Sequence, residues 1–531
     1  MKWLSRPEGM QMSVAVGVEL EPAVTRRLLE HAAVGTNPER LEVIAPFTGA
    51  VLYSMPISTE VDVAACVATA RKAQGWWAQR PVQERARIFL KFHDLVMQRR
   101  DEGLDIIQLE TGKARRDAME EILDVLIVAR HYARDAVRLM RPVRHRGVLP
   151  LLVGVEELRH PKGVVGIISP WNYPLTLAAS DAIPALLAGN AVVLKPDSQT
   201  SLTALWVVDL MIEAGVPESV IRVVTGDGQV VGPMLIDRVD YVMFTGSTQV
   251  GREVARRCGE RLIGCSLELG GKNAMIIRAD VDVARAVEIA VRACFANAGQ
   301  LCVSIERMYI HEEVMQPFLD LFLPRVAAMR MVAEIGWGAD MGSLISQRQL
   351  DRVQVHLADA IAHGARVLVG GRARPEVGPY YLEPTVLAGV TEDMELCRDE
   401  TFGPVVAVYP FTSDEQAVAM ANDTFYGLNA SVLTRDTQAG RKIAAQLKAG
   451  TVNINEGYAA AWGSVRAPMG GMGDSGLGRR HGSEGFLQYT EVQTIATQRA
   501  FGFGAPFGWS NERWGGTLAN AVGAMKKLGF K

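Results

Sequence analysis

Gly163-Val164-Val165-Gly166-Ile167-Ile168-Ser169 is a short apolar run that ends at Pro170, and it predicts a buried β-strand. A helix over 181–188 follows, and Ala191-Val192-Val193-Leu194 predicts a second buried strand. The alternation continues with helices at 201–214 and 246–257 and strands at 220–224 and 241–244. Strands that alternate with helices predict a parallel sheet with helices on both faces. Ligands of such sheets bind at the carboxyl ends of the strands, where this chain has Lys195 and Thr245-Gly246-Ser247.

A second alternating stretch begins at Asn273 and continues to about residue 450. Its predicted strands are 273–277, 366–369, 405–408 and 451–454, and Asp280 is the predicted N-cap of a helix at 283–295. Ahead of both stretches, residues 61–80, 82–99 and 102–139 carry spaced apolar positions that predict helices. The fold class is therefore α/β, with two Rossmann-like parallel-sheet domains. Glu268 and Gly270-Gly271 fall at their seam, and seams between domains favour active sites.

Bulk properties exclude several classes of protein. The chain has 531 residues, of which 48% are hydrophobic, so it is long enough for more than one domain of roughly 150 residues. Its net charge of −3 lacks the basic excess of a nucleic-acid-binding protein. No apolar run reaches the roughly 20 residues of a membrane span, and the N-terminus lacks the apolar core of a signal peptide, so we expect a cytoplasmic protein.

Six cysteines in so long a chain form no disulfide framework, and no pattern predicts a metal site. A reduced cysteine is most often a small buried apolar residue, so Cys302 needs separate support for a chemical role. Cys302 ends the run Asn297-Ala298-Gly299-Gln300-Leu301-Cys302, and Glu268 opens Glu268-Leu269-Gly270-Gly271-Lys272. A thiol can attack a carbonyl carbon and a carboxylate can activate water, so these two groups are parts of a covalent enzyme.

Gly246-Ser247-Thr248-Gln249-Val250-Gly251 follows a predicted strand and opens a helix, where backbone N–H groups suit a phosphate. The run lacks the middle glycine of Gly-x-Gly-x-x-Gly. Taken alone, it is a tight turn more often than a dinucleotide site, and both interpretations stay open at this point.

Six motifs occur in a fixed order along the chain: Pro170-Trp171-Asn172-Tyr173-Pro174, Leu194-Lys195-Pro196, Phe244-Thr245-Gly246-Ser247-Thr248, Glu268-Leu269-Gly270-Gly271-Lys272, Asn297-Ala298-Gly299-Gln300-Leu301-Cys302 and Glu400-Thr401-Phe402-Gly403-Pro404. Together they resemble the aldehyde dehydrogenase superfamily, over about residues 40–497. Two further stretches are similar in sequence to actinobacterial NADP-type succinate-semialdehyde dehydrogenases. They are Lys195-Pro196-Asp197-Ser198-Gln199-Thr200 and Met469-Gly470-Gly471-Met472-Gly473.

The resemblance implies a catalytic set. Cys302 would form a thiohemiacetal with an aldehyde, and the Asn172 amide and the Cys302 backbone N–H would stabilise the oxyanion. Hydride transfer to a nicotinamide would leave a thioester, which Glu268 would hydrolyse by activating water. For the cofactor, the resemblance implies binding by Lys195 and Glu400 at the riboses, Gly246 and Ser247 at the pyrophosphate, and Trp171 and Phe402 near the nicotinamide.

Ser198 departs from the pattern of many NAD-using members, which carry glutamate at this position. A carboxylate there would repel a 2′-phosphate by about 1 kcal/mol or more. Serine removes that repulsion, and Lys195 can attract the phosphate. We therefore expect NADP as the preferred cofactor, with NAD as the alternative.

The substrate is a small-molecule aldehyde, and the resemblance makes succinate semialdehyde the first candidate. The arginines that hold its distal carboxylate in relatives are replaced here by Ala296 and Ser180, so Arg466, Ser464 or backbone amides would have to serve instead. Alternatively the pocket is apolar and takes neutral aliphatic or aromatic aldehydes. Its expected lining residues are Tyr173, Leu177, Leu301, Tyr458 and Trp462.

Three rival functions are weaker. A cysteine hydrolase needs a histidine beside the thiol, and no motif places one of the nine histidines near Cys302. Coenzyme-A-acylating relatives commonly lack the glutamate that this chain has as Glu268. A non-catalytic homologue is disfavoured because Cys302, Glu268 and Asn172 occur together.

We predict a dinucleotide-binding domain at 1–145 and 161–268, a catalytic domain at 269–480, and oligomerisation strands at 146–160 and 481–497. Within the latter, 150–160 and 484–497 look extended and could pair with each other or with a partner subunit, which implies a homodimer or homotetramer. The tail at 498–531 carries an amphipathic stretch at 517–530 and would cover the substrate mouth or a subunit surface. Its aromatic residues are Phe501, Phe503, Phe507, Trp509 and Trp514.

Overall fold

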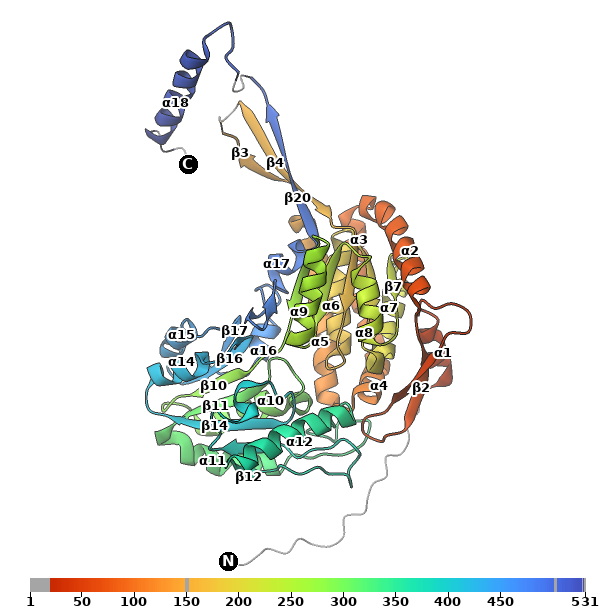
Figure 1. Cartoon of the computed structure of the whole chain (residues 1–531), viewed down its shortest axis with the longest axis vertical. Helices are drawn as coiled ribbons and strands as arrows, with labels where there is room; N and C mark the ends of the chain where they lie inside the picture. Colours follow the sequence, from red (N-terminus) through yellow and green to blue (C-terminus); the bar gives the residue numbers. More distant parts are fainter. Residues whose placement is uncertain (1–19, 149–151, 501–503, 528, 530–531) are drawn as a thin grey trace, which may run out of the picture.

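The computed structural model describes residues 20–148, 152–500, 504–527 and 529. The chain forms two α/β lobes, each built on one mostly parallel sheet, and an antiparallel arm that projects from the first lobe (Figure 1). The α/β class with two parallel-sheet units and a small separate β segment is confirmed. Within the described part of the chain, no helix is both long and apolar enough to cross a bilayer.

The first lobe contains a six-stranded sheet in the order β19-β9-β8-β5-β6-β7. Five neighbouring strands run parallel, and only β19 is antiparallel, to β9. Every residue of β6 is buried, as expected for a strand covered by helices on both faces. The strands are β5 (Val164–Ile168), β6 (Ala191–Lys195), β7 (Ile221–Val223), β8 (Tyr241–Thr245), β9 (Gly264–Glu268) and β19 (Gly476–Leu477).

Helices surround this sheet, and Trp77 and Trp206 are fully buried among them. The helix predicted over 102–139 is two helices, because Gly112 adopts φ 70° and ends α4 in the left-handed conformation. An N-terminal hairpin, β1 (Arg40–Ile44) and β2 (Val51–Pro56), precedes α2. The helices are α1 (Pro22–Leu29), α2 (Glu60–Gln79), α3 (Val82–Gln98), α4 (Arg100–Thr111), α5 (Arg115–Leu139), α6 (Pro174–Leu187), α7 (Ser201–Ala214), α8 (Gly228–Ile236) and α9 (Thr248–Glu260), with a 3-10 turn, η1, at Ser198–Thr200.

The second lobe contains a seven-stranded sheet in the order β12-β13-β14-β11-β10-β16-β17, antiparallel only at the edge strand β12. Its strands are β10 (Asn273–Ile277), β11 (Ile305–His311), β12 (Arg366–Val369), β13 (Thr385–Ala388), β14 (Val405–Phe411), β16 (Asn429–Leu433) and β17 (Thr451–Ile454). A short pair, β15 (Tyr426–Gly427) and β18 (Met472–Gly473), lies beside it. Its helices are α10 (Val283–Phe295), α11 (Glu312–Ala327), α12 (Gln347–Ala362), α13 (Glu395–Arg398), α14 (Asp414–Asn422), α15 (Thr437–Ala444) and α16 (Ala459–Trp462), with a turn, η2, at Ala296–Gly299.

The predicted N-cap of α10 is wrong by two residues. Asp282 is the N-cap, and its carboxylate accepts a hydrogen bond from the Arg285 N–H at 3.2 Å. Asp280 instead accepts hydrogen bonds from the backbone N–H groups of Arg435 and Asp436, at 3.0 and 2.8 Å. Asp280 therefore joins two loops of the second lobe.

The arm is a three-stranded antiparallel sheet of β3 (Val143–Arg146), β4 (Val153–Pro161) and β20 (Thr490–Gln498). The predicted pairing of the two extended segments is confirmed, because β20 pairs with β4 from Thr490↔Pro161 to Gln498↔Val153. The third strand, β3, was not predicted. The extended prediction for 484–487 is wrong, since these residues belong to α17 (Gly482–Leu487), whose Phe486 is buried. Pro150 lies outside the described residues.

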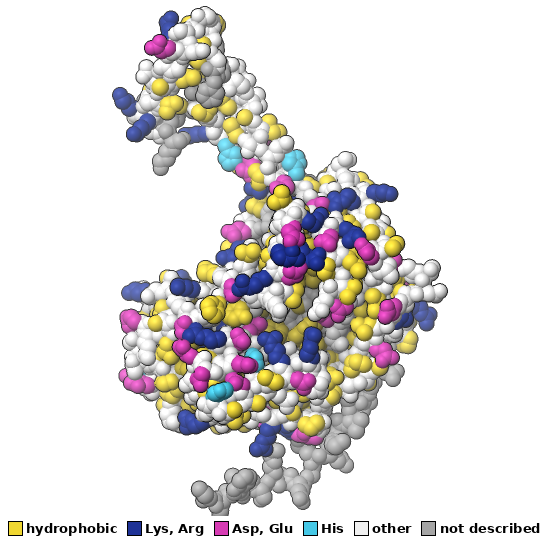
Figure 2. Space-filling model, viewed as in Figure 1, with side chains coloured by type: hydrophobic (Ala, Val, Ile, Leu, Met, Phe, Trp, Pro, Cys, Tyr) yellow, Lys and Arg dark blue, Asp and Glu magenta, His cyan; other side chains and the backbone are white. Residues whose placement is uncertain are grey.

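The C-terminal tail forms α18 (Asn511–Lys527) at the tip of the arm, away from both lobes (Figure 1). The helix starts earlier than the predicted amphipathic stretch, and the end of that stretch, like Phe501 and Phe503, lies outside the described residues. On the face of the two lobes seen in Figure 2, acidic and basic side chains are mixed and form no single-sign field, as the small net charge suggests.

Candidate active site

Cys302 follows a strained turn between α10 and β11. Asn297 and Ala298 have φ angles of 51° and 53°, in the left-handed region that asparagine tolerates and alanine seldom adopts. The turn is held at its start, where the Asn297 N–H donates to the Asp117 carboxylate at 3.0 Å. A Cβ atom at Gly299 would lie 2.0 Å from the Gly403 carbonyl oxygen, so only glycine fits there. Strain stored in this way is common beside reactive residues.

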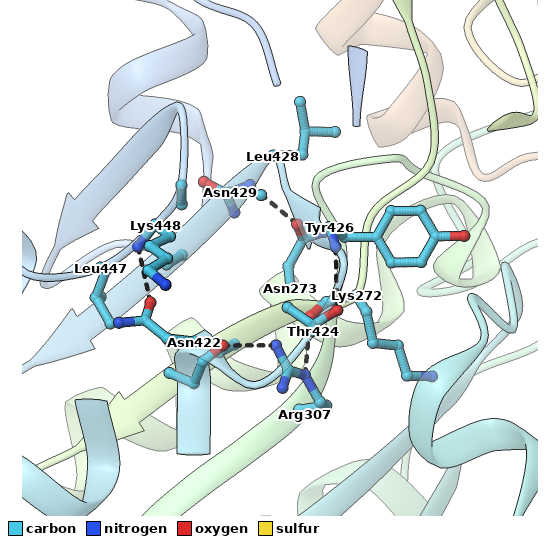
Figure 3. A pocket seen from close by; sticks show the side chains of 15 residues that line it. Lys272, Asn273, Arg307, Asn422, Thr424, Tyr426, Leu428, Asn429, Leu447 and Lys448 are labelled. Carbon is cyan, nitrogen blue, oxygen red and sulfur yellow. Dashed lines mark hydrogen bonds between the residues drawn. The ribbon is translucent and has the colours of Figure 1, made fainter. Parts of the chain in front are cut away.

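The carbonyl group of Cys302 is fixed from the second lobe by Asn273. Its amide donates to the carbonyl oxygens of Cys302 and Ser304, both at 2.7 Å, and its side-chain oxygen accepts from the Asn429 N–H at 3.0 Å. Figure 3 shows Asn273 directed toward Asn429 in a small polar pocket that also contains Arg307. Arg307 donates to the carbonyl oxygens of Lys272 and Ala421, both at 2.9 Å. The chain's own groups satisfy these side chains, so the pocket supports the nucleophile turn.

Cys302, Glu268 and Asn172 line one cavity. Asn172 lies in the segment between β5 and α6, and its amide donates to the Gln300 carbonyl oxygen at 3.1 Å. An amide carries two N–H bonds, so one remains for the cavity. The Asn172 carbonyl oxygen accepts from the buried ammonium of Lys113 at 2.6 Å and from the Asn297 amide at 3.1 Å. These contacts fix the backbone on both sides of the cavity.

Glu268 ends β9, where the chain crosses from the first lobe to the second. Its Oε1 atom is buried and has no hydrogen-bond partner among the described residues. The pKa of Glu268 is raised to about 8, chiefly by burial; the charge of Arg480 acts against this rise and that of Asp181 adds to it. A carboxyl group with such a pKa can both accept and release a proton near neutral pH.

Burial also raises the pKa of the Cys302 thiol to about 12, and the charges of Glu268 and Glu400 add to the effect. Arg480 and the Val303 N–H act in the opposite direction. The thiol is therefore neutral at rest, and its activation requires a nearby base. Glu268 lines the same cavity and is a candidate for that base.

The opposite wall of the cavity is apolar. Four of the five predicted pocket residues, Tyr173, Leu177, Leu301 and Trp462, line it. Tyr458 belongs to the same apolar cluster, but it packs behind the wall, with its ring centroid 6.4 Å from that of Trp462. The wall is held by Glu120, which accepts hydrogen bonds from the hydroxyls of Tyr173 and Tyr458, both at 3.0 Å.

The predicted cofactor residues of the first lobe lie at the carboxyl ends of its strands. Lys195 ends β6 and is buried, and its ammonium makes no hydrogen bond to any residue the structure describes. Burial lowers the pKa of Lys195, whereas Asp197 and Asp227 raise it. Ser198 donates to the Gly226 carbonyl oxygen at 2.8 Å. Gly246 follows β8, and Ser247 is the N-cap of α9, so the free N–H groups of this helix end face the same edge.

The other cofactor candidates come from both lobes and meet. Trp171 of the first lobe and Phe402 of the second pack edge to face, with ring centroids 5.5 Å apart. Phe402 has a left-handed φ of 54°, and its N–H donates to Glu306 at 2.9 Å. Glu400 accepts from the Gly271 N–H at 2.9 Å, and a Cβ atom at Gly270 would lie 2.6 Å from its carboxylate. The two glycines after Glu268 therefore allow Glu400 to approach the backbone closely.

The model of the "Aldehyde dehydrogenase family" matches residues 33–495. The chain belongs to this family. A protein of Mycolicibacterium smegmatis named "Putative succinate-semialdehyde dehydrogenase", with NADP(+) in its name, is 54% identical over 482 residues, which are 91% of this chain and 93% of that protein. A relative of the same name from Mycobacterium ulcerans is 52% identical, over 95% of this chain and 98% of its own length.

A solved structure of the family has the same fold. Betaine aldehyde dehydrogenase from Staphylococcus aureus, determined in complex with NAD+, superposes with a TM-score of 0.85 at 28% sequence identity. The match covers 92% of this chain and 99% of the other. The family resemblance and the fold read from the sequence are both confirmed.

Sequence reasoning missed a row of carboxylates on α5. Asp117, Glu120, Glu121 and Asp124 recur at helical spacing, so they share one face of α5, which packs against α6. Asp117 and Glu120 pair with Arg292, and Glu121 pairs with Lys113 at 2.6 Å. The spacing is visible in the sequence, but only the fold shows that this face is buried beside the nucleophile turn.

The arginine in the cavity is not the one that the sequence suggested. Arg466 and Ser464 are exposed and do not line the cavity. Arg480 lines it instead, and its guanidinium donates to Asp181 at 2.5 Å and to Thr245 at 2.8 Å. His481 lines the same cavity, although no sequence motif indicated it, and burial lowers its pKa to about 3. A histidine with so low a pKa is a weak base and therefore a poor activator of a thiol.

Proposed function

We propose that this protein oxidises an aldehyde to a carboxylic acid with NAD(P), through a thiohemiacetal and a thioester on Cys302. The observation that carries the proposal is one cavity lined by a thiol, a carboxylate of raised pKa and a free amide N–H, closed on its other side by apolar side chains. This combination suits attack on a neutral carbonyl group followed by hydrolysis.

The residues divide the work as follows. Glu268 takes the proton of the Cys302 thiol, and the resulting thiolate attacks the carbonyl carbon. The Asn172 amide and the Cys302 N–H donate to the oxyanion that forms. A bound nicotinamide would supply the hydride acceptor. Glu268 passes the thiol proton to solvent and then removes a proton from water, which attacks the thioester. The acid is released, Cys302 leaves as the thiolate, and Glu268 returns its proton to the sulfur. The raised pKa of Glu268 suits both proton transfers, because the group returns readily to either state.

We propose NADP as the preferred cofactor and NAD as the alternative. Lys195, whose ammonium has no hydrogen-bond partner among the described residues, and Ser198 would hold the adenine-side ribose and its phosphate. Gly246 and Ser247 would lie by the pyrophosphate. Glu400 would hold the nicotinamide ribose, and Trp171 and Phe402 would pack near the ring. Lys195, buried and unpartnered at the end of a parallel strand, fits an anionic or hydroxyl-bearing group. The NADP(+) in the names of the two relatives supports the same choice.

The names of the relatives also make succinate semialdehyde the first substrate to test. A second candidate, a neutral aliphatic or aromatic aldehyde, is favoured by the apolar wall of Tyr173, Leu177, Leu301 and Trp462. The sequence also favours a neutral aldehyde, because it has Ala296 and Ser180 where relatives carry carboxylate-binding arginines.

The predicted boundaries of the dinucleotide-binding domain, the catalytic domain, the oligomerisation strands and the tail remain proposals. A homodimer or homotetramer is proposed because the outer edges and faces of the arm are exposed, Val492 and Ile495 among them. A cytoplasmic location is also a proposal. Light scattering of the purified protein tests the assembly.

The test of the function is a set of kcat/KM values for several aldehydes with NADP and with NAD. We expect reduction of the cofactor that depends on an aldehyde and on Cys302, with higher kcat/KM for NADP. Absence of cofactor reduction with every aldehyde would overturn the proposal. Rapid hydrolysis of an activated ester without a cofactor, together with no oxidation of any aldehyde, would favour a cysteine hydrolase.

A further inference from the structure

Of the four carboxylates on the buried face of α5, Asp124 differs from the other three in its ion pairing. Asp117, Glu120 and Glu121 each pair with a cation, either Arg292 or Lys113. Asp124 makes no ion pair within the described residues and accepts only the Ser180 hydroxyl, at 2.7 Å. Its side chain is 4% exposed, and a buried carboxylate without a cationic partner is costly. Asp124 is therefore the one carboxyl group of the row that forms no ion pair with a described residue.

Asp124 and Ser180 line the cavity that holds Cys302. Buried polar atoms without a hydrogen-bond partner also line this cavity, on Thr176, Glu268, Arg480 and His481. These atoms point to a polar ligand that the chain does not itself supply. Asp124 is thus open to the substrate cavity and is not enclosed in the protein core.

Arg480 is the one cationic side chain among the residues that line this cavity, and it already has partners within the protein. It pairs with Asp181 at 2.5 Å and donates to Thr245, and its charge also opposes that of Glu268. Three carboxylates, Asp124, Asp181 and Glu268, thus face one guanidinium. A substrate carboxylate would add negative charge to a buried site that already holds three carboxyl groups, whereas an ammonium would balance the ionised form of Asp124.

We infer that Asp124 determines substrate specificity by binding a cationic group, an ammonium, at the far end of the aldehyde. This inference rests on the proposed oxidation at Cys302 and names the aldehyde class as amino- or ammonio-aldehydes. The apolar wall contacts the carbon chain between the two ends, and Ser180 orients the Asp124 carboxylate. Burial raises the pKa of Asp124 to about 7, and a bound ammonium would lower it again, so that binding and ionisation reinforce each other.

The experiment compares kcat/KM of the NADP-loaded full chain for four aldehydes. Two are cationic, 3-aminopropanal and 4-(trimethylammonio)butanal; succinate semialdehyde is anionic, and 4-methylpentanal is its neutral isostere. We expect at least one cationic aldehyde to exceed both others by about tenfold or more. Asp124→Asn should remove that preference and improve the relative rate with succinate semialdehyde. The matched control is Asp135→Asn, on the same helix but paired with Arg138 at the surface, which should leave the order unchanged.

The outcomes separate the two ideas. If no aldehyde is oxidised, the proposed function fails. If 4-methylpentanal or succinate semialdehyde is oxidised best and Asp124→Asn changes nothing, the proposed function stands and only this inference fails. If the variant does not fold, inhibition of the wild-type enzyme decides the matter. Propylammonium should then compete with 4-methylpentanal at lower concentration than propanoate, and the reverse order would mean that Arg480 captures anions and would overturn the inference.

Discussion

Glu268→Gln is the most informative substitution, because it changes one proton and almost no volume. The pKa of about 8 means that the carboxyl group is ionised to about one tenth at pH 7 and about nine tenths at pH 9. If Glu268 activates water, kcat should therefore rise about tenfold across this range wherever hydrolysis of the thioester limits the rate. Ionisation of the Cys302 thiol, with a pKa of about 12, adds no slope under this condition, because attack by the thiol then does not limit the rate.

The assay is a stopped-flow measurement of cofactor reduction together with mass spectrometry of the protein. Glu268→Gln should lower kcat by about 10²–10⁴-fold and abolish its slope between pH 7 and 9. Any aldehyde that still reacts should leave its acyl group on Cys302, visible as added mass. Attack by the thiol should also slow, since the same carboxylate is the proposed base for that step.

Glu400→Gln is the matched control, because Glu400 also has a pKa raised to about 8 by burial and the charge of Glu306. As a proposed cofactor residue it should alter the KM for the cofactor and leave the slope of kcat in place. A slope that survives in Glu268→Gln and disappears in Glu400→Gln would refute the assignment of the base.

Cys302→Ser should reduce aldehyde oxidation below detection while circular dichroism stays unchanged, because a serine hydroxyl is a far weaker nucleophile here. Ser198→Glu should lower kcat/KM for NADP by about fivefold or more, through repulsion of about 1 kcal/mol, and spare NAD. Lys113→Met should lower the free energy of unfolding by about 3–5 kcal/mol, because it leaves the buried carboxylate of Glu121 unpaired, and a melting temperature within the error of wild type would contradict this. Asp124→Asn should stabilise the fold by up to about 4 kcal/mol at pH 8 and very little near pH 4. The reason is that the pKa of Asp124 is about 7 in the folded protein and ordinarily 3.8, so the wild type loses stability as the pH rises between these values. Denaturant unfolding at both pH values measures the difference.

The elements and the nucleophile motifs could be predicted from the sequence, because the signals are local. A short apolar run such as Val164–Ile168 is recognisable wherever it packs, and Lys195 follows such a run by position alone. The pairing of β4 with β20 was also foreseeable, since two extended segments need a partner. Helix boundaries were less secure, and Gly112 divides a region that looked like one helix.

The sequence by itself determined which chemical groups this protein has: a thiol at 302, a carboxylate at 268, and strands that end at Lys195 and Thr245. Only the tertiary structure decided what surrounds them. Asp124, Asp181 and Arg480 come from three separate segments, and no local pattern indicates that they share a cavity with Cys302. Burial and neighbouring charge set the pKa values and leave Asp124 without a cation, and both depend on distances across the fold, which residue order along the chain does not specify.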